Sequence, residues 1–486
     1  MKLLTTLALL GTLTAAPVIA AQDASADATT QTRIARVERG LLDPVVVAGQ
    51  PWPTATLADR MRQLHVPGLS VTVIDGGRIA WTRSYGLADA QTGRPLTTET
   101  ALQTGSLSKP VAAVLAMRLR ETGRLDLDAD VAGVLSLESD HPITTRALLS
   151  HTAGLPGGGF TGYDTQGPLP TPSQILRGEP PAQNPPASVT GSPVYRYSSL
   201  GYVALQQVLA PSGADDFATL AQRLVLRPLS MTRSFFAAAP VGGQAATVAR
   251  GHDLAGAPLP GGFKRHPELA AAGLWSTSED MARLLIAVDR ASRGKSPGFL
   301  RAESARALLM PVGEGYGLGF ELDGSGLAET VGHSGSNVGY KALMLIHPRT
   351  GQGAVVLTNG DGGWPLIEAL VRAIAAEYRW PDRQPIKRSV TAPSLAWYDR
   401  YVGRYSVSGL ILEISRDGDK LMLAGPPLGD RPVQLLPSGE HRFFIREKDA
   451  QLQLDPSDEG SVRTLTFIDG RPRPGRRVEG AAAKTP

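Results

Sequence analysis

The spacing of the hydrophobic residues changes near residue 381, and this change constrains the fold more than any other feature of the sequence. Before it, apolar residues recur at helical spacing in several segments. Beyond it, short runs alternate between apolar and polar residues and are separated by turn signals such as Asp417-Gly418. We therefore expect a large α/β part, followed by a small antiparallel sheet that closes into a barrel or a sandwich.

The first part combines strands near both of its ends with helices between them. Residues 69–86 are typical of a hairpin around Asp75-Gly76-Gly77, and two more strands are expected on either side of 348–353. This order predicts a sheet assembled from distant segments and a second, helical lobe. Helices are expected at 56–64, 106–122, 145–150 and 365–380, from Ser198, and after a capping box of Ser276 and Glu279.

The N-terminus is typical of an exported protein. Lys2 precedes a short apolar stretch at 3–14, and Val18-Ile19-Ala20 suits cleavage by a signal peptidase. We expect a signal peptide at 1–21 and a periplasmic or secreted protein without a transmembrane anchor after cleavage. An uncleaved anchor helix is the alternative.

Composition excludes several kinds of chemistry. The chain has no cysteine, which rules out disulfides, thiolate metal sites and a cysteine nucleophile. Its histidines lack metal-ligand spacing such as H-E-x-x-H, and it has no glycine-rich phosphate loop. The net charge of +4 comes from short basic patches without interleaved aromatics. We expect no cofactor, no metal and no nucleic-acid partner.

Ser106 and Lys109 form the first candidate catalytic element. Residues three apart share a helix face, so the two side chains are expected side by side at the start of the helix. The helix N-terminus adds backbone donors that favour negative charge. A buried lysine is costly unless it has a task or a partner. The alternative is that Ser106 only caps the helix and Lys109 is solvated.

Two further segments carry candidate residues. Tyr197 lies between a long loop rich in proline and glycine (154–193) and a helix, and a neighbouring ammonium would lower its pKa and make it a general base. Gly332-His333-Ser334-Gly335 precedes a strand and could expose backbone N–H groups to an oxyanion. A packed loop tyrosine and a plain turn are the alternatives. Ser334 is rejected as an α/β-hydrolase nucleophile because no helix follows it.

In this order, Ser106-x-x-Lys109, Tyr197-Ser198-Ser199 and His333-Ser334-Gly335 resemble the motifs of the penicillin-recognising serine hydrolases. The nearest groups are class C β-lactamases, DD-peptidases, family VIII esterases and D-aminopeptidases. The segments LLSHTAGLPG and YGLGFEL also resemble that family. The resemblance implies a β-lactamase/transpeptidase-like fold, with a mostly antiparallel sheet flanked by helices and a helical lobe. The C-terminal sheet resembles a lipocalin-like barrel.

The expected organisation follows from these observations. It comprises a signal peptide (1–21), a flexible leader (22–50), a serine hydrolase domain (51–380), a linker (381–394), a small β-barrel (395–480) and a tail (481–486).

The resemblance also implies roles for the candidate residues. Ser106 would be the acyl-enzyme nucleophile, Lys109 would take its proton or tune Tyr197, and Tyr197 would act as general base and then protonate the leaving group. The backbone N–H groups of Ser106 and Ser336 would form the oxyanion hole. The residues expected to contact substrate are Ser199, His333, Ser334 and Gly335.

Two positions depart from the family pattern. Ser199 stands where an asparagine is usual, which would leave Lys109 less restrained. His333 stands where class C β-lactamases have lysine, and a neutral histidine attracts a substrate carboxylate less than an ammonium does. We therefore expect an exported serine hydrolase acting on esters or D-amino-acid peptides and amides, ahead of β-lactams. Its partners would be small-molecule or peptide substrates, including peptidoglycan-derived ones. The alternative is a catalytically weak member that binds peptidoglycan fragments or an envelope partner.

Overall fold

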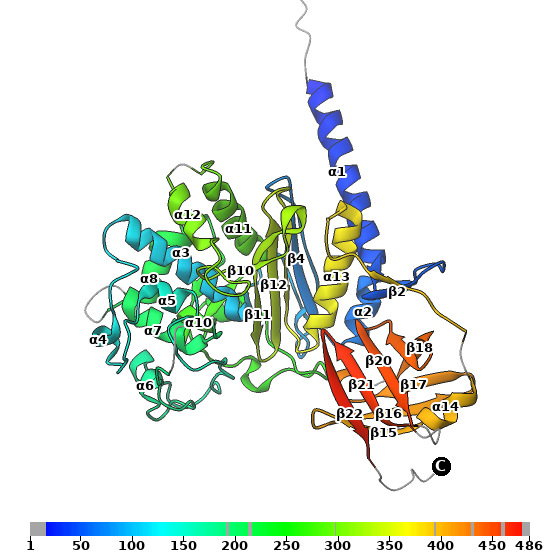
Figure 1. Ribbon diagram of the computed structural model, residues 1–486. Coiled ribbons are helices and arrows are strands. Elements are labelled where there is room, and N and C mark those ends of the chain that lie inside the picture. The colour runs from blue at the N-terminus through cyan, green and yellow to red at the C-terminus, as the bar shows by residue number, and fades with distance from the viewer. Residues whose placement is uncertain are drawn as a thin grey trace, which may run out of the picture.

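The computed structural model describes residues 16–190, 194–211, 216–296, 298–392, 395–428, 432–457 and 462–478. Figure 1 shows a helical lobe on one side of a central sheet, and helices and a barrel on its other side. The expected signal peptide (1–21) falls largely, and the tail (481–486) wholly, outside the described residues. Within them, no helix has both the length and the hydropathy needed to cross a bilayer.

The central sheet joins strands from both ends of the main domain. Every neighbouring pair in it is antiparallel. Thr358 of one distant strand pairs with Leu69 of another, which confirms a sheet assembled from distant segments. In spatial order the strands are β10 (Glu321–Asp323), β11 (Thr330–Asn337), β12 (Tyr340–His347), β13 (Gln352–Thr358), β4 (Gly68–Asp75), β5 (Arg78–Asp89) and β6 (Arg94–Pro95).

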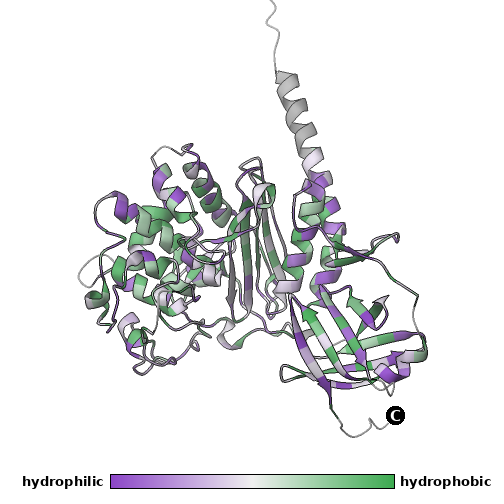
Figure 2. Cartoon of the chain, in the orientation of Figure 1, coloured by the Kyte–Doolittle hydropathy of each residue, from purple (hydrophilic) through white to green (hydrophobic). Residues whose placement is uncertain are grey.

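Helices cover both faces of this sheet. α11 (Ser278–Ser292) packs on β4, β12 and β13 from the side of the lobe, and α13 (Gly363–Tyr378) packs on β12 and β13 from the other side. The sheet therefore separates two hydrophobic cores, one continuous with the lobe and one beneath α13. Figure 2 shows hydrophobic residues along the strands of the sheet and within the lobe.

The helical lobe surrounds α3 (Ser108–Glu121), most of whose side chains are buried. The helix expected at 106–122 begins with a 3₁₀ turn, Gly105–Leu107, before α3. The long loop at 154–193 contains a short helix. The other helices of the lobe are α4 (Ala132–Leu135), α5 (Thr145–Leu149), α6 (Pro172–Arg177), α7 (Ser199–Leu209), α8 (Phe217–Ala221), α9 (Gln244–Thr247), α10 (Leu269–Ala272) and α12 (Ala302–Leu308).

Short strands connect the lobe to its surroundings. β7 (Leu102–Gln103) and β8 (Phe235–Phe236) flank β9 (Leu274–Ser276) in a small sheet. The capping box expected from Ser276 and Glu279 is wrong by one position. Thr277 is the N-cap of α11 and accepts from the backbone of Asp280, whereas Ser276 ends β9, because the strand pairing continues up to that residue.

The C-terminal part is a closed antiparallel barrel, as expected. The first strand pairs with the last, so neither leaves a free edge. Alternate side chains point inward and form a separate core that includes Tyr405 and Leu412. The barrel follows α14 (Leu395–Tyr401), and its strands are β15 (Gly403–Val407), β16 (Leu410–Asp417), β17 (Lys420–Ala424), β18 (Val433–Gly439), β19 (Arg442–Ile445), β20 (Ala450–Pro456), β21 (Val462–Asp469) and β22 (Arg471–Arg477).

The expected linker (381–394) also contains ordered structure. β14 (Ile386–Arg388) pairs in parallel with β2 (Val45–Val47). Val45 and Val47 then pack against Phe444 of the barrel. The N-terminal segment therefore connects the main domain to the barrel.

We expected residues 22–50 to form a flexible leader, and this is wrong for the part whose side chains are described. The segment forms α1 (Ala16–Arg39), β1 (Leu41–Leu42) and β2; β1 pairs with β3 (Thr54–Ala55), ahead of α2 (Leu57–Gln63). Ile34, Val37 and Leu41 are buried against the core beneath α13. The sequence alone does not reveal this packing, because the apolar stripe is short and its packing partner lies more than three hundred residues away.

Packing of α1 predicts a stability effect at Ile34. Its side chain is 3% exposed, and Arg36 on the same helix forms a bidentate ion pair with Glu377 of α13. Replacing Ile34→Ala should lower the free energy of unfolding by about 2–4 kcal/mol, because it leaves a cavity. Urea unfolding followed by tryptophan fluorescence measures this. The exposed Thr32→Ala is the control and should change stability by less than about 0.5 kcal/mol. Equal effects of the two substitutions would mean that α1 does not pack.

Candidate active site

Ser106 lies in the 3₁₀ turn between β7 and α3, and its side chain does not cap the helix. Leu107 is the N-cap of α3, and neither the turn nor α3 has a side-chain capping hydrogen bond. Gly105 adopts a positive φ of 54°, which turns the chain sharply before the serine. Ser108 fixes this turn by donating to Gly105 O at 2.7 Å and accepting from Leu274 N at 3.0 Å. The geometry therefore excludes the capping alternative.

Lys109 is buried next to the serine without a carboxylate in hydrogen-bonding range. Its Nζ lies 2.9 Å from Ser106 Oγ, 3.3 Å from Ser199 Oγ and 3.0 Å from the backbone oxygen of Ala271. Burial lowers the pKa of Lys109 to about 7, although the charge of Glu321 opposes the shift. A substantial fraction of the amine is thus neutral at neutral pH and can accept the serine proton.

Tyr197 is the second group that contacts the hydroxyl of Ser106. Its hydroxyl lies 2.9 Å from Ser106 Oγ, and Lys109 Nζ lies 5.0 Å from the centre of its ring. We expected the ammonium to lower the pKa of Tyr197, and this is wrong. Burial raises that pKa; the hydrogen bond with Ser106 partly opposes the rise, and the charges of Glu321 and Tyr195 add smaller increases. The phenol keeps its proton, so Lys109 is the better base.

His151 positions the segment that carries Tyr197. Its Nδ1 accepts from the backbone N–H of Ser198 at 3.1 Å, and its ring lies 4.4 Å from the ring of Tyr197. Its backbone oxygen also accepts from Arg196 N. Burial, followed by the charges of Lys109 and His333, lowers the pKa of His151 to about 2, so the ring stays a neutral acceptor.

The backbone of β11 brings a second N–H group to the serine. Asn337 and Tyr340 close a two-residue turn, so the next pair, Ser336 with Lys341, points its N–H groups away from the partner strand. Ser334 has the same parity, and its N–H does point outward. A Cβ on Gly105 would meet Ser336 N at 2.7 Å. The turn that carries Ser106 therefore lies against the edge of β11 from which the N–H of Ser336 points outward, as an oxyanion hole requires.

The expected motif at 332–335 lies inside β11 rather than before a strand. Gly335 is required there, because a Cβ would meet Thr104 O at 2.1 Å. His333 is 1% exposed, with Nδ1 2.6 Å from Ser334 O and Nε2 3.0 Å from the hydroxyl of Tyr316. Burial lowers its pKa despite the opposing charge of Glu321. We expected His333 to contact substrate directly. Because both ring nitrogens have partners within the protein and the ring is covered, His333 supports the site instead.

Ser334 and Ser199 were both expected to contact substrate, but they differ in burial and in their partners. Ser334 is half-buried and donates its hydroxyl to Glu321 Oε1 at 2.7 Å. Ser199 is buried at the start of α7 and contacts Lys109. The carbonyl of Ala271 supplements this contact, so the lysine remains fixed despite the shorter side chain.

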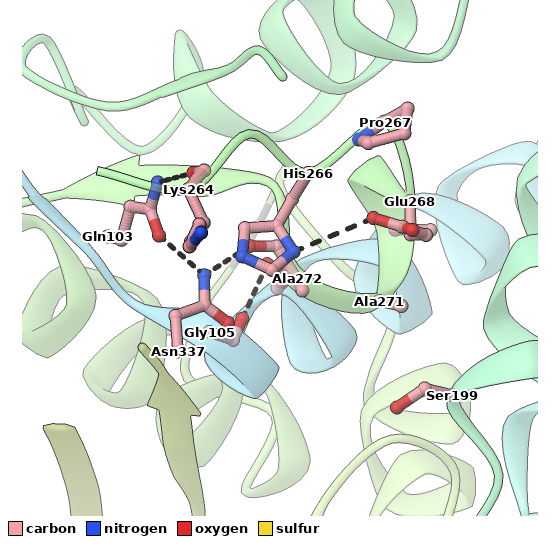
Figure 3. Close-up of polar contacts among 12 residues, drawn as sticks. Gln103, Gly105, Ser199, Lys264, His266, Pro267, Glu268, Ala271, Ala272 and Asn337 are labelled. Atoms are coloured by element: carbon pink, nitrogen blue, oxygen red, sulfur yellow. Dashed lines mark hydrogen bonds and ion pairs between the residues drawn. The ribbon is translucent and has the colours of Figure 1, made fainter. Parts of the chain in front are cut away.

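Sequence reasoning missed an amide network that joins three parts of the site (Figure 3). Asn337 Nδ2 donates to Gln103 Oε1 at 2.8 Å and to Ala272 O at 3.2 Å, and Gln103 Nε2 donates to Lys264 O at 2.7 Å. The network links three elements: β11, which carries Ser336; β7, which leads into the turn of Ser106; and α10, which carries the acceptor for Lys109. Single amides in a sequence give no local indication of such a link.

The side chains of His266 and Glu268 lie close together at the start of α10. His266 Nδ1 is 3.6 Å from Glu268 Oε2, and both side chains are almost fully buried (Figure 3). Glu268 is the N-cap residue of α10, and its backbone oxygen accepts from Ala271 N and Ala272 N. The pair therefore belongs to the support of the helix that holds Lys109. Among the described residues, no group of His, Asp and Glu side chains is arranged to hold a metal ion.

Comparison with known proteins gives the class to which this geometry belongs. The family model described as Beta-lactamase matches residues 54–377, more than half of the chain. The chain therefore belongs to the β-lactamase family of serine hydrolases, which also contains penicillin-binding proteins and esterases.

Particular relatives cover most of the chain. Penicillin-binding protein 4* of Bacillus subtilis (strain 168) is 25% identical over 441 residues, which are 85% of this chain and 96% of that protein. Esterase EstB of Burkholderia gladioli is 28% identical over 378 residues, which are 66% of this chain and 94% of EstB. The octameric penicillin-binding protein homologue from Pyrococcus abyssi has the same fold, with a TM-score of 0.59 and 23% identity over 86% of this chain and 98% of that one.

Close contact at Gly105 predicts that even a methyl group there impairs catalysis. Gly105→Ala should lower kcat/KM for p-nitrophenyl butyrate by about 10²-fold, comparable to the loss of one oxyanion donor. Gly93→Ala is a matched control, because Gly93 also has a positive φ, 72°, but no neighbouring atom within 4 Å of the added Cβ. Equal losses in both variants would attribute the effect to backbone strain instead of the site.

The lowered pKa of Lys109 predicts the pH dependence of activity. The neutral amine is the active form, so kcat/KM should rise with pH, with a midpoint near 7, and be about tenfold below the plateau at pH 6. Initial rates of p-nitrophenyl butyrate hydrolysis between pH 5 and 9, corrected for spontaneous hydrolysis, measure this. A rate that is still rising steeply at pH 9, as an ordinary lysine would give, would contradict the lowered pKa of Lys109.

Proposed function

We propose that the protein is a serine hydrolase that forms an acyl-enzyme on Ser106 and acts on esters or on D-amino-acid peptides and amides. One observation carries the proposal: Ser106 Oγ lies 2.9 Å from both Lys109 Nζ and the hydroxyl of Tyr197. One group can accept a proton and the other can donate one, both within reach of the same oxygen.

Acylation uses these two groups in sequence. Neutral Lys109 accepts the proton of Ser106 as Oγ bonds to the substrate carbonyl carbon, and the N–H groups of Ser106 and Ser336 stabilise the oxyanion. When the intermediate collapses, Tyr197 gives its proton to the leaving group and regains one from the Lys109 ammonium. Water then attacks the carbonyl carbon of the acyl-enzyme and gives a proton to neutral Lys109. Ser106 Oγ leaves as the carbon–oxygen bond breaks and takes a proton back, which releases the acid and restores the enzyme.

The state of His333 favours esters and D-amino-acid substrates over β-lactams. His333 is uncharged and covered, so it supplies no cation for a substrate carboxylate. EstB is named an esterase, and the structure of SurE with D-Leu has a TM-score of 0.54 and 26% identity over 87% of this chain and 97% of that one. Peptidoglycan-derived peptides belong to the same proposed substrate class. We also propose export to the periplasm or medium, on the pattern of residues 1–21.

Removing the nucleophile tests the proposal. Ser106→Ala should reduce p-nitrophenyl acetate and butyrate hydrolysis by at least about 10³-fold, because the acyl-enzyme cannot form. Wild type, but not this variant, should gain the mass of one fluorophosphonate adduct in intact-protein mass spectrometry.

Ser415→Ala is the control for this experiment, because Ser415 is exposed on barrel strand β16. It should match wild type in both assays. Turnover retained in Ser106→Ala would refute the proposal. A wild type that binds muropeptides tightly without turnover or labelling would favour the binding alternative.

A further inference from the structure

One carboxylate lies along the open edge of β11 beside the oxyanion hole. It belongs to Glu321 of β10, which pairs with Gly332. β10 extends no further along β11 towards Ser336, so this part of the edge has no strand partner on that side. There the Glu321 side chain satisfies Ser334, accepting from its N–H at 3.1 Å and from its hydroxyl at 2.7 Å. The side chain of Glu321 is still 39% exposed.

The position of this carboxylate relative to the hole follows from strand geometry. Ser334 and Ser336 are two residues apart and direct their N–H groups to the same edge. Two residues of a strand span about 7 Å. A substrate with its carbonyl oxygen at Ser336 and an extension along this edge therefore passes Glu321.

Tyr197 indicates which part of the substrate extends that way. Its hydroxyl donates to the leaving group in the proposed mechanism, and its ring lies 6.2 Å from that of His333 and 6.3 Å from that of Tyr316. His333 Nδ1 in turn lies 3.4 Å from Glu321. Glu321 is thus on the leaving-group side of Ser106.

The groups around Glu321 do not neutralise its charge. Within the described part of the chain, no lysine or arginine lies within ion-pair distance of it, and His333 is its ion-pair partner only if protonated. Burial lowers the pKa of His333 and of Lys109 and raises that of Tyr195, Tyr197 and Tyr316. All five changes favour neutral side chains, so at pH values above about 7, where most of Lys109 is neutral, Glu321 gives the leaving-group side a net negative charge.

We propose that Glu321 determines the charge selectivity of the site, favouring substrates with a cationic leaving group and disfavouring those with a carboxylate there. The inference rests on the proposed function, because it assigns a leaving-group side to the same serine site. It adds a substrate class: esters, thioesters or amides whose departing alcohol, thiol or amine carries an ammonium group.

A matched set of thioesters tests this selectivity. Acetylthiocholine and 3,3-dimethylbutyl thioacetate have leaving groups of the same shape that differ in charge, and S-acetyl-3-mercaptopropionate carries a carboxylate. Thiol release can be followed with Ellman's reagent, since the protein has no cysteine to react. In wild type, kcat/KM should be about three- to tenfold higher for the cation than for the neutral isostere, and lowest for the anion. The preference should shrink as salt screens the charge.

Variants separate charge from structure. Glu321→Gln should abolish the preference between the cationic and neutral thioesters, measured as the ratio of their kcat/KM values within the same variant. Glu321→Asp should retain the preference, because it keeps the charge. Glu413→Gln, an exposed position in the barrel, makes the same change in net charge and should behave as wild type.

Binding to the Ser106→Ala variant gives an independent readout. Calorimetry should show tighter binding of acetylthiocholine than of 3,3-dimethylbutyl thioacetate, and the added Glu321→Gln change should remove the difference. If no preference exists in either assay, or if Glu321→Gln leaves it intact, the inference is wrong even where Ser106 remains essential. If wild type turns over none of the thioesters, the proposed function fails, and the binding difference alone supports or refutes the role of Glu321.

Discussion

Burial of the Lys109 amine is the constraint on which the site depends. A lysine without solvent or a bonded carboxylate loses much of its tendency to be charged, and here its pKa falls to about 7. This environment requires three separate segments: α3 supplies the lysine, α7 supplies Ser199, and α10 supplies the carbonyl of Ala271. The same packing that stabilises the lobe therefore lowers the pKa of Lys109, while burial raises that of Tyr197.

Contact between β11 and the turn before α3 is the second requirement, and it explains two glycines. Side chains at Gly105 and Gly335 would collide with Ser336 and Thr104, so the strand edge and the serine turn can meet only through bare backbone. The network of Gln103 and Asn337 holds the same segments from the other side. Glu321 then occupies the remaining length of the edge, which gives the site its charge. Catalytic geometry and substrate selectivity thus share one strand.

The sequence predicted the general architecture because its periodicities are local. The hairpin at 69–86, the helix after Ser106 and the alternating barrel strands each carry their pattern within a few residues. It failed where the pattern was weak or the partner distant. The stripe of Ile34, Val37 and Leu41 gave no clear helix, and the strand at Ile386–Arg388 is paired only because the N-terminal segment lies beside it.

The sequence by itself determined which chemical groups the site could contain. Ser106 with Lys109 at helical spacing, Tyr197 before a helix and the motif at 332–335 supplied the candidate groups, and their resemblance to the family predicted a serine nucleophile beside a lysine. Only the tertiary structure decided how these groups act. Burial, and so the pKa values of Lys109, Tyr197 and His333, depends on neighbours far apart in the chain, as does the exposure of Glu321. Desolvation and charge are properties of the assembled environment, which no local spacing encodes.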